Sequence, residues 1–335
     1  MWFSRQKSVL GVDIGTSDIK IVQINQDSKT LETYGIVNLP VPITTKITTD
    51  ELASIIELLR NLVEKARVTT KSCVVSLPNS AVFTSIIDLP QMSDKELDSA
   101  VRFEAKKYVP LPPSDIYLSW TMISQNQANK TLKILIIAVP KQIRDLYVKI
   151  FEQAGLELQA IEIEALSLIR TLVSDLSKND VIIDIGGKVT GINFVKEGLL
   201  HLTRNLNIGG DTITEKIAQA LNLDVHRAQQ FKHDFGLTGT EFLPEAVKPV
   251  LSSIKEEIKQ LANLYKSHNV NIDRLVFTGG GSQMPGLVEY FNDLEIATAM
   301  GDTLVNISYP QEATEVLKRF GPQLSVAVGL ALREV

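Results

Sequence analysis

Two short segments combine a carboxylate with glycine at the end of an apolar run, a combination that suits phosphate and cation binding. Residues 10–16 read LGVDIGT and residues 181–187 read VIIDIGG, so Asp13 and Asp184 each precede an Ile-Gly pair. Glycine lets the backbone turn sharply, and successive N–H groups can then form a nest for phosphate oxygens. A nearby carboxylate can hold Mg²⁺ through its waters, because this ion dehydrates reluctantly. One such loop is a weak signal, whereas two of them indicate a joint site.

A third glycine segment strengthens this signal. Residues 275–278 predict a buried strand that runs into Gly279, Gly280 and Gly281. Other phosphate-binding motifs do not fit. Ile182 stands where a Walker A loop needs its first glycine, and the late glycine run lacks the third glycine of a dinucleotide-binding fingerprint.

The surroundings of the two Asp-Ile-Gly segments repeat as well. Each segment predicts a strand, a short polar loop, a returning strand and a third strand, and the two copies lie about half the chain apart. The matching order indicates the internal duplication of a whole lobe. The length of 335 residues also exceeds one typical core and favours two lobes.

The predicted elements assign the chain to the α/β class. We expect a first lobe over residues 1–175 and a second over residues 176–320, with a helix over residues 321–335 that packs back on the first. Within the first lobe, residues 73–150 alternate strands with capped or proline-ended helices and predict an inserted subdomain.

Composition argues against several classes of protein. The net charge is −5 without a long Lys/Arg run, so we expect no nucleic-acid partner. The single cysteine, Cys73, provides neither a disulfide framework nor a Cys-based metal site, and a buried strand position is expected for it. No apolar run is long enough to span a bilayer or to form a signal peptide, so we expect a cytoplasmic protein. For the N-terminal seven residues we expect a frayed terminus, with weak membrane contact of Trp2 and Phe3 as the alternative.

The glycine segments together resemble the actin-like ATPase superfamily, and the order of the motifs agrees along almost the whole chain. VDIGTS at residues 12–17, IDIGG at 183–187 and FTGGG at 277–281 are similar to its first phosphate, second phosphate and adenosine motifs. IGGD at residues 208–211 is similar to its Gly-Gly turn, and residues 161–169 to its first connecting helix. The resemblance implies two duplicated ribonuclease-H-like lobes that close on ATP and Mg²⁺.

Three further segments narrow the resemblance to the PilM family of type IV pilus assembly proteins, which are relatives of FtsA. They are VSLP at residues 75–78, IDLP at 87–90 and EAKKYVP at 104–110. The resemblance implies an extra subdomain in the first lobe and an ATP-binding scaffold on the inner face of the cell membrane. Such a scaffold would bind the cytoplasmic N-terminal segment of a PilN-type membrane protein and associate with the membrane through it. The sequence leaves a homo-oligomer open.

The resemblance also implies roles for individual residues. Asp13 and Asp184 would hold Mg²⁺, and Asp184 and Glu164 would act near the attacking water. A solvated surface charge is the alternative for Glu164, Lys20 and Lys232. The residues expected around the phosphates, ribose and adenine are Gly15, Thr16, Ser17, Lys20, Gly186, Gly187, Thr190, Gly209, Gly210, Lys232, Gly279, Gly280, Gly281 and Ser282.

Catalysis is less well supported by the sequence than binding. Phosphoryl transfer depends on positioning and charge stabilisation, and no arginine finger can be identified. We therefore expect ATP to bind well and to be hydrolysed slowly at most. A small-molecule kinase of the sugar-kinase branch is an alternative, although no acid is evident that would accept a hydroxyl proton. A filament-forming, FtsA-like cytoskeletal protein is another.

Overall fold

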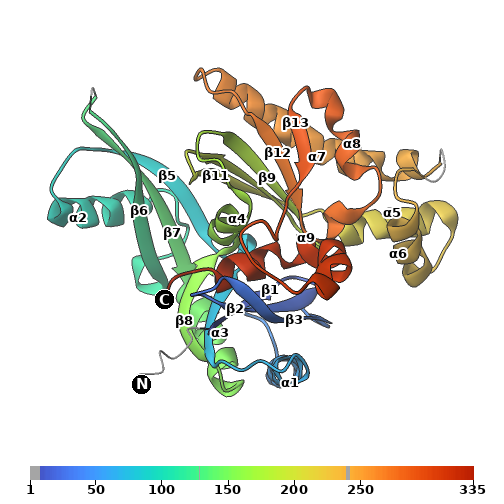
Figure 1. The fold of residues 1–335 in the computed structure, drawn as a ribbon. Coiled ribbons are helices and arrows are strands. Elements are labelled where there is room, and N and C mark those ends of the chain that lie inside the picture. The colour runs from blue at the N-terminus through green and yellow to red at the C-terminus, as the bar shows by residue number, and fades with distance from the viewer. Residues whose placement is uncertain (1–7, 128, 239–241) are drawn as a thin grey trace.

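A computed structural model describes residues 8–127, 129–238 and 242–335. The prediction for Trp2 and Phe3 therefore lies outside the described residues. The described ranges form two five-stranded sheets and one three-stranded sheet, with helices around and between them (Figure 1). No helix in these ranges is long and apolar enough to cross a membrane.

The two five-stranded sheets have the same topology. The first has the order β3-β2-β1-β4-β8 and the second the order β11-β10-β9-β12-β13. In each, three antiparallel strands are followed by two parallel ones, which confirms the predicted duplication. The strands of the first sheet are β1 (Ser8–Ile14), β2 (Asp18–Asn25), β3 (Thr30–Asn38), β4 (Ser72–Leu77) and β8 (Glu157–Ile163). Those of the second are β9 (Asn179–Ile185), β10 (Thr190–Lys196), β11 (Leu199–Leu206), β12 (Arg274–Thr278) and β13 (Ala297–Met300).

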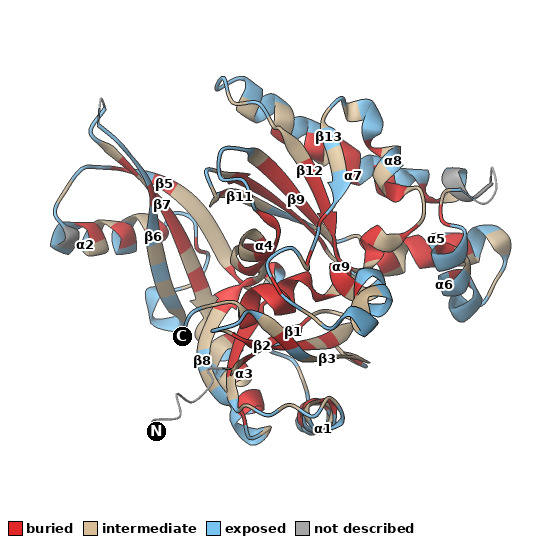
Figure 2. Ribbon diagram, in the orientation of Figure 1, coloured by how far each residue is buried: buried red, intermediate tan, exposed pale blue. Residues whose placement is uncertain are grey.

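Each sheet has its own helices and its own core. α1 (Thr49–Lys65) and α3 (Lys141–Gln153) pack on the first sheet, and α1 begins with a capping box formed by Thr48 and Glu51. The helices of the second sheet are α5 (Gly210–Leu221), α6 (Val225–Asp234), α7 (Phe242–Lys266) and α8 (Leu287–Tyr290). The central strands β1 and β9 are buried almost throughout (Figure 2). Their nearly continuous apolar sequence is what strands covered on both faces require.

The three-stranded sheet projects from the first lobe. It has the order β5-β7-β6, formed by β5 (Phe83–Pro90), β6 (Ile116–Asn126) and β7 (Thr131–Pro140), and α2 (Asp94–Ala105) packs against it. β4 and α3 overlap the ends of the predicted range 73–150, but β4 pairs with β1 and α3 packs on α1. The separate sheet therefore spans residues 83–140.

Two helices lie between the five-stranded sheets. These are α4 (Glu164–Leu172) and α9 (Thr314–Ala331), which pack on each other and form one apolar cluster with residues of both sheets (Figure 1). The predicted C-terminal helix began too late, because α9 starts at Thr314 and continues through Gly321 and Pro322. Both residues are buried, so tertiary packing outweighs their low helix propensity. In the segment 161–169, the first three residues end β8, and the helix starts at Glu164.

Candidate functional site

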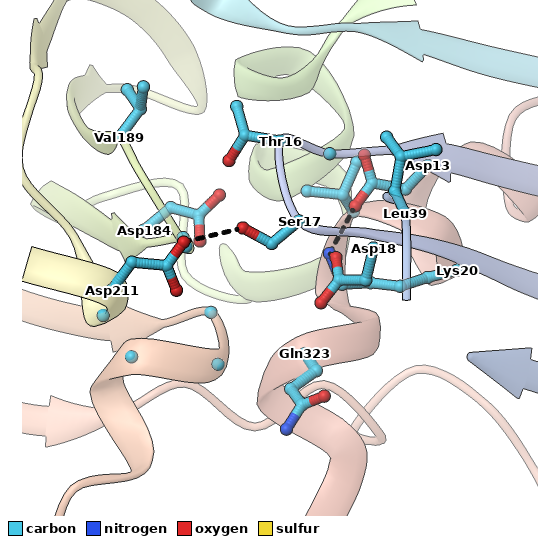
Figure 3. Close-up of a pocket in the computed structure, with 18 of the residues that line it drawn as sticks. Asp13, Thr16, Ser17, Asp18, Lys20, Leu39, Asp184, Val189, Asp211 and Gln323 are labelled. Atoms are coloured by element: carbon cyan, nitrogen blue, oxygen red, sulfur yellow. Dashed lines mark hydrogen bonds and ion pairs between the residues drawn. The ribbon is translucent and has the colours of Figure 1, made fainter. Parts of the chain in front are cut away.

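A cavity of ≈ 740 Å³ lies where the two five-stranded sheets face each other. Its wall combines the loops that follow β1, β9 and β12 with the start of α5, one face of α6 and the middle of α9 (Figure 3). The expected site residues on this wall are Asp13, Gly15, Thr16, Ser17, Lys20, Glu164, Asp184, Gly186, Gly187, Gly210, Lys232, Gly279, Gly280 and Gly281. Folding thus brings together segments from both halves of the chain.

The two Asp-Ile-Gly loops have the same local geometry. The N–H of Gly15 donates to the carbonyl of Asp18 at 2.9 Å, and the N–H of Gly186 donates to the carbonyl of Val189 at 3.0 Å. Each loop is therefore a tight turn closed by its glycine. Each aspartate is the last residue but one of its strand, so the turn holds the carboxylate at the edge of the cavity.

The loops contact each other across the cleft. The Lys188 N–H donates to Thr16 Oγ1 at 3.2 Å, and Ser17 Oγ donates to Asp211 Oδ2 at 3.1 Å (Figure 3). A Cβ on Gly187 would lie 2.0 Å from Ser17 Oγ, so only glycine fits there in this arrangement. Both Asp-Ile-Gly loops consequently border one small volume.

Backbone donors are available around this volume. In the described part of the chain, the N–H groups of Thr16, Ser17 and Gly187 make no hydrogen bond. The first turn of α5 is anchored beside them, because the Gly210 N–H donates to the Gly186 carbonyl at 2.9 Å. Unpaired N–H groups and a helix N-terminus are the usual protein partners of phosphate.

Acidic side chains are concentrated on the same wall, where burial and the neighbouring carboxylates raise the pKa of two of them. Burial, assisted by Asp13 and opposed by Lys20, raises the pKa of Asp184 to about 6. Burial together with the charges of Asp13 and Asp184 raises the pKa of Glu164 to about 8. The N–H of Asn79 donates to Glu164 Oε2 at 3.1 Å and works against this rise.

Lys20 supplies the positive charge nearest to these acids. Its Nζ lies 3.2 Å from Asp13 Oδ2 and 2.5 Å from Asp18 Oδ1. Burial alone would lower the pKa of Lys20, but the two carboxylates outweigh burial and raise it. Lys20 is therefore held as a cation inside the cleft rather than on the solvated face of a strand.

The residues present fit a magnesium nucleotide. Within the described ranges, no three His, Cys, Asp or Glu side chains are arranged to hold a metal ion directly. Asp13, Asp184 and Glu164 nevertheless all line the cavity, and Mg²⁺ is usually held by one or two carboxylates, waters and phosphate oxygens. A further polar group lacks a partner, because Asn79 Oδ1 is buried on this wall without a hydrogen bond in the described part of the chain.

Lys232 is buried and committed to protein contacts. Its Nζ donates to the Gly210 carbonyl at 2.9 Å, to Thr214 Oγ1 at 2.7 Å and to Gln229 Oε1 at 3.2 Å. Burial lowers the pKa of Lys232 to about 8, although Asp211 opposes this shift. The side chain thus joins α6 to α5, and the alternative of a solvated surface lysine is wrong.

Three expected residues lie behind the wall rather than on it. Thr190 Oγ1 donates to the Ile208 carbonyl at 2.8 Å, and Ser282 Oγ donates to the Gly279 carbonyl at 2.7 Å. Gly209 packs so closely that a Cβ would lie 2.5 Å from the Gly187 carbonyl oxygen. These residues support the loops that border the cavity.

The wall also contains residues that the sequence prediction missed, among them Asp211, Asn79 and Gln323. Asp211 directly follows the Gly-Gly turn, and its position beside that turn was the available signal. Asn79 follows β4 as Gly280 follows β12, and both lie at the start of a short 3₁₀ helix. Gln323 lies in the middle of α9 and has no local sequence signal.

Known proteins are similar to this chain in sequence and in fold. The cell division protein FtsA of Enterococcus faecalis (strain ATCC 700802 / V583) is 25% identical over 334 residues, covering 85% of this chain and 76% of FtsA. The MreB5 structure from Spiroplasma citri, described as bound to AMPPNP, has a TM-score of 0.53 at 13% identity and covers 94% of this chain and 97% of its own. At such low identity the structural likeness shows the fold, which is that of the actin-like ATPases.

The strongest of these similarities extend over nearly the full length. A chain of the "PilM-PilN type IV pilus biogenesis complex" matches with a TM-score of 0.87 and 24% identity, covering 98% of this chain and 98% of that one. The family model described as "Type IV pilus assembly protein PilM" matches residues 11–335. With its duplicated sheets, its added three-stranded sheet and this match, the chain belongs to the PilM family of type IV pilus assembly proteins.

Proposed function

We propose that this chain is an Mg-ATP-binding scaffold of the type IV pilus assembly platform at the inner face of the cell membrane. Its nucleotide would occupy the cavity between the lobes, which we assign to residues 1–175 and 176–320. The observation that carries the proposal is the meeting of two equivalent glycine turns, each with its own aspartate, across one cleft.

The family resemblance suggests the role of each group, and the geometry of the wall is compatible with it. Asp13 and Asp184 would hold Mg²⁺ through water, and the free N–H groups of the two loops would bind the β- and γ-phosphates. The Gly279–Gly281 turn and the start of α5 would border the ribose and adenine. Bound Mg²⁺ would compensate the burial and the carboxylate repulsion that raise the pKa of Asp184 and Glu164 in the free protein.

A PilN-type cytoplasmic segment would bind where the three-stranded sheet meets the first lobe. β6 is an edge strand there, and edge strands can accept an extended peptide by main-chain hydrogen bonding. Tyr117 on β6 is 44% exposed. The Tyr117 ring centroid lies 5.6 Å from Lys141 Nζ and 5.0 Å from Arg144 Cζ. The pair of cations beside an aromatic ring would favour a peptide with an acidic residue next to an apolar one.

A direct binding assay tests both halves of this proposal. Mg-ATP affinity would be measured by calorimetry, and the affinity for a labelled peptide of the partner's cytoplasmic N-terminus by anisotropy, with and without Mg-ATP. We expect Tyr117→Ala to weaken the peptide and to leave Mg-ATP affinity unchanged, with Arg102→Gln on α2 as the control. Equal peptide binding by Tyr117→Ala and the parent would exclude this docking site, and no heat with Mg-ATP would exclude the nucleotide.

Pelleting and turnover assays address the two alternatives. ATP-dependent sedimentation of the purified chain would favour a filament-forming protein. ATP consumption that starts only when a particular sugar is added would favour a kinase. We expect neither.

A further inference from the structure

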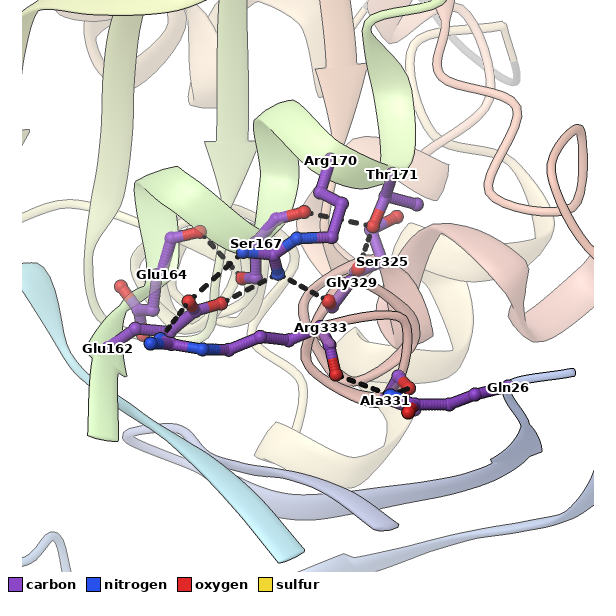
Figure 4. A network of polar contacts seen from close by, with 10 residues as sticks. All are labelled: Gln26, Glu162, Glu164, Ser167, Arg170, Thr171, Ser325, Gly329, Ala331 and Arg333. Carbon is purple, nitrogen blue, oxygen red and sulfur yellow. Dashed lines mark hydrogen bonds and ion pairs between the residues drawn. The ribbon is translucent and has the colours of Figure 1, made fainter. Parts of the chain in front are cut away.

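A buried carboxylate next to the cleft is held by two arginines (Figure 4). Glu162 Oε1 lies 2.8 Å from Arg170 Nη1, and Glu162 Oε2 lies 3.1 Å from Arg170 Nη2 and 2.7 Å from Arg333 Nη1. The Glu162 side chain is only 3% exposed. Arg170 belongs to α4, and Arg333 follows α9. We refer to Glu162, Arg170 and Arg333 as the Glu162 cluster.

The Glu162 cluster is connected to the nucleotide cavity by a junction without a loop. β8 ends at Ile163, and α4 begins at the next residue, Glu164, whose side chain lines the cavity. The Glu164 carbonyl accepts from Ser167 Oγ at 2.8 Å, which fixes the first turn of α4. Because no flexible residues separate Glu162 from Glu164, a shift of the first must move the second.

α9 has no free space in which to slide past this junction. A Cβ on Gly329 would lie 2.1 Å from the Ser167 carbonyl oxygen, and a Cβ on Gly11 would lie 2.0 Å from the Ala327 carbonyl oxygen. Arg170 Nη1 also donates to the Gly329 carbonyl at 2.5 Å. Helices packed this closely move together with their neighbours, since interiors transmit strain.

The other part of α9 belongs to the cavity wall. The Pro322 carbonyl accepts from the Gly279 N–H at 2.9 Å and from Thr278 Oγ1 at 3.0 Å. Gln323 lies on the wall beside this contact. One rigid helix therefore joins the glycine turn of the second lobe to the Glu162 cluster of the first.

We propose that Arg170 and Arg333 are positioning residues for the nucleotide site, which they serve by holding Glu162 and thereby placing Glu164 in the cleft. The inference rests on the proposed nucleotide function. Loss of Arg333 leaves Glu162 with one partner and frees the segment after α9, so the start of α4 loses its fixed position. Since coupling free energies are reciprocal, bound Mg-ATP must in turn tighten the Glu162 cluster.

Three variants and a control test this role. Arg333→Gln removes the contact, Arg333→Lys keeps the charge, and Gln26→Ala removes the bonds from Gln26 Nε2 to the carbonyls of Ala331 and Arg333 without unpairing a buried charge. The control is Arg102→Gln, because Arg102 pairs with Asp98 on the surface of the three-stranded subdomain. For each, Mg-ATP affinity, urea unfolding and amide hydrogen exchange over residues 163–170 are measured.

We expect Arg333→Gln to weaken Mg-ATP about five-fold and to speed exchange locally at residues 163–170. Arg333→Lys should recover much of the Mg-ATP affinity and of the protection from exchange. Gln26→Ala should lower both, but less than Arg333→Gln does, and Arg102→Gln should behave as the parent. If Arg333→Gln does not fold, Gln26→Ala decides the question.

Two results would overturn the inference. One is that Arg333→Gln and Gln26→Ala bind Mg-ATP as tightly as the parent and exchange amide hydrogens at residues 163–170 at the same rate as the parent. The other is faster exchange throughout the chain that merely follows the loss of global stability. If the parent itself fails to bind Mg-ATP, the proposed function fails, whereas local exchange at residues 163–170 still decides whether the Glu162 cluster positions Glu164.

Discussion

In the first sheet Asp13 faces Lys20 across the β1–β2 hairpin, whereas in the second sheet the equivalent Asp184 faces Gly191 across the β9–β10 hairpin. A second difference lies on the neighbouring parallel strand. Ser76 of β4 donates to Asp13 Oδ1 at 2.9 Å, while Thr278, at the corresponding position of β12, donates to the Pro322 carbonyl. Among the described residues, the first carboxylate therefore contacts a cation and a hydroxyl, whereas the second makes neither contact.

This difference shows how two copies of a duplicated lobe can keep the same backbone and still differ in electrostatic role. The backbone turns remained the same, but the charges around them diverged. The Asp13 carboxylate of the first loop has Lys20 as a counterion, so the nucleotide-free protein can hold this charge in the cleft. The second loop keeps a carboxylate whose pKa is raised to about 6, which makes it a stronger partner for an added cation.

The largest expected effect concerns the nucleotide itself. At a hundred times its Kd, Mg-ATP should stabilise the parent chain by about 2.7 kcal/mol, or several degrees in Tm. Asp13→Ala should lose most of this shift, because it removes one of the two carboxylates proposed to hold Mg²⁺. Thermal unfolding with and without Mg-ATP measures the effect. An undiminished shift would refute the assignment of Asp13.

Neutralising the two aspartates should change the free energy of unfolding in opposite directions. Without nucleotide, Asp13→Asn should destabilise the chain, because Lys20 loses a carboxylate at 3.2 Å. Asp184→Asn should stabilise it at pH 7 by on the order of 2 kcal/mol, because it removes a charge that burial disfavours. Urea unfolding of both variants would measure the difference, and a change of the same sign in both would contradict the comparison.

The stability gained by Asp184→Asn should depend on pH, because the pKa of Asp184 is raised in the folded state. The folded-state pKa of Asp184 is raised to about 6 from a usual value of 3.8. The folded state therefore binds the proton more tightly, and the stability that protonation contributes is present below about pH 4 and lost as the pH rises to about 6. The advantage of Asp184→Asn should accordingly vanish near pH 4. A constant advantage from pH 4 to pH 8 would rule out this cause.

The equivalent glycines give a smaller contrast. A Cβ on Gly186 would lie 2.9 Å from the backbone oxygen of Val189, whereas a Cβ on Gly15 would lie 3.3 Å from the side-chain atom Asp18 Oδ1. Gly186→Ala must displace backbone and should cost about 1 to 2 kcal/mol, more than Gly15→Ala. Urea unfolding of the two variants compares them, and the reverse order would show that the second loop has more free space.

The smallest effect tests the contact between the loops. Ser17→Ala removes the hydrogen bond to Asp211 and should lower the free energy of unfolding by about 0.5 to 1 kcal/mol. The matched control is Ser114→Ala, since Ser114 makes an exposed bond to the adjacent Asp115. Equal effects of the two substitutions would indicate that the loops do not depend on each other in solution.

The local parts of the site could be predicted from the sequence. The Asp-Ile-Gly turns are set by neighbouring residues, and the apolar runs before them specify buried strands, so the duplicated hairpins followed from periodicity. The repeated strand order predicted the two lobes, the alternation of strands and helices predicted the inserted subdomain, and the family resemblance agreed with both.

Contacts between distant segments could not be predicted in this way. The bond from Ser17 to Asp211 depends on how two lobes meet, and the bonds of Lys232 to Gly210 and Thr214 depend on how α6 packs on α5. The start of α9 at Thr314 was missed because Gly321 and Pro322 disfavour helix locally, while burial between the sheets outweighs that preference.

The packing of α9 on β1 has a consequence for the order of events during synthesis. The outer apolar residues of β2 and β3, among them Val22, Ile24 and Leu31, are buried against α9, and Gly11 touches Ala327. A ribosome delivers β1 first and α9 only some three hundred residues later. Until then the first sheet would expose an apolar face that other chains could bind. We expect nascent chains that lack α9 to be captured by holdase chaperones and to be released once residues 314–331 have emerged.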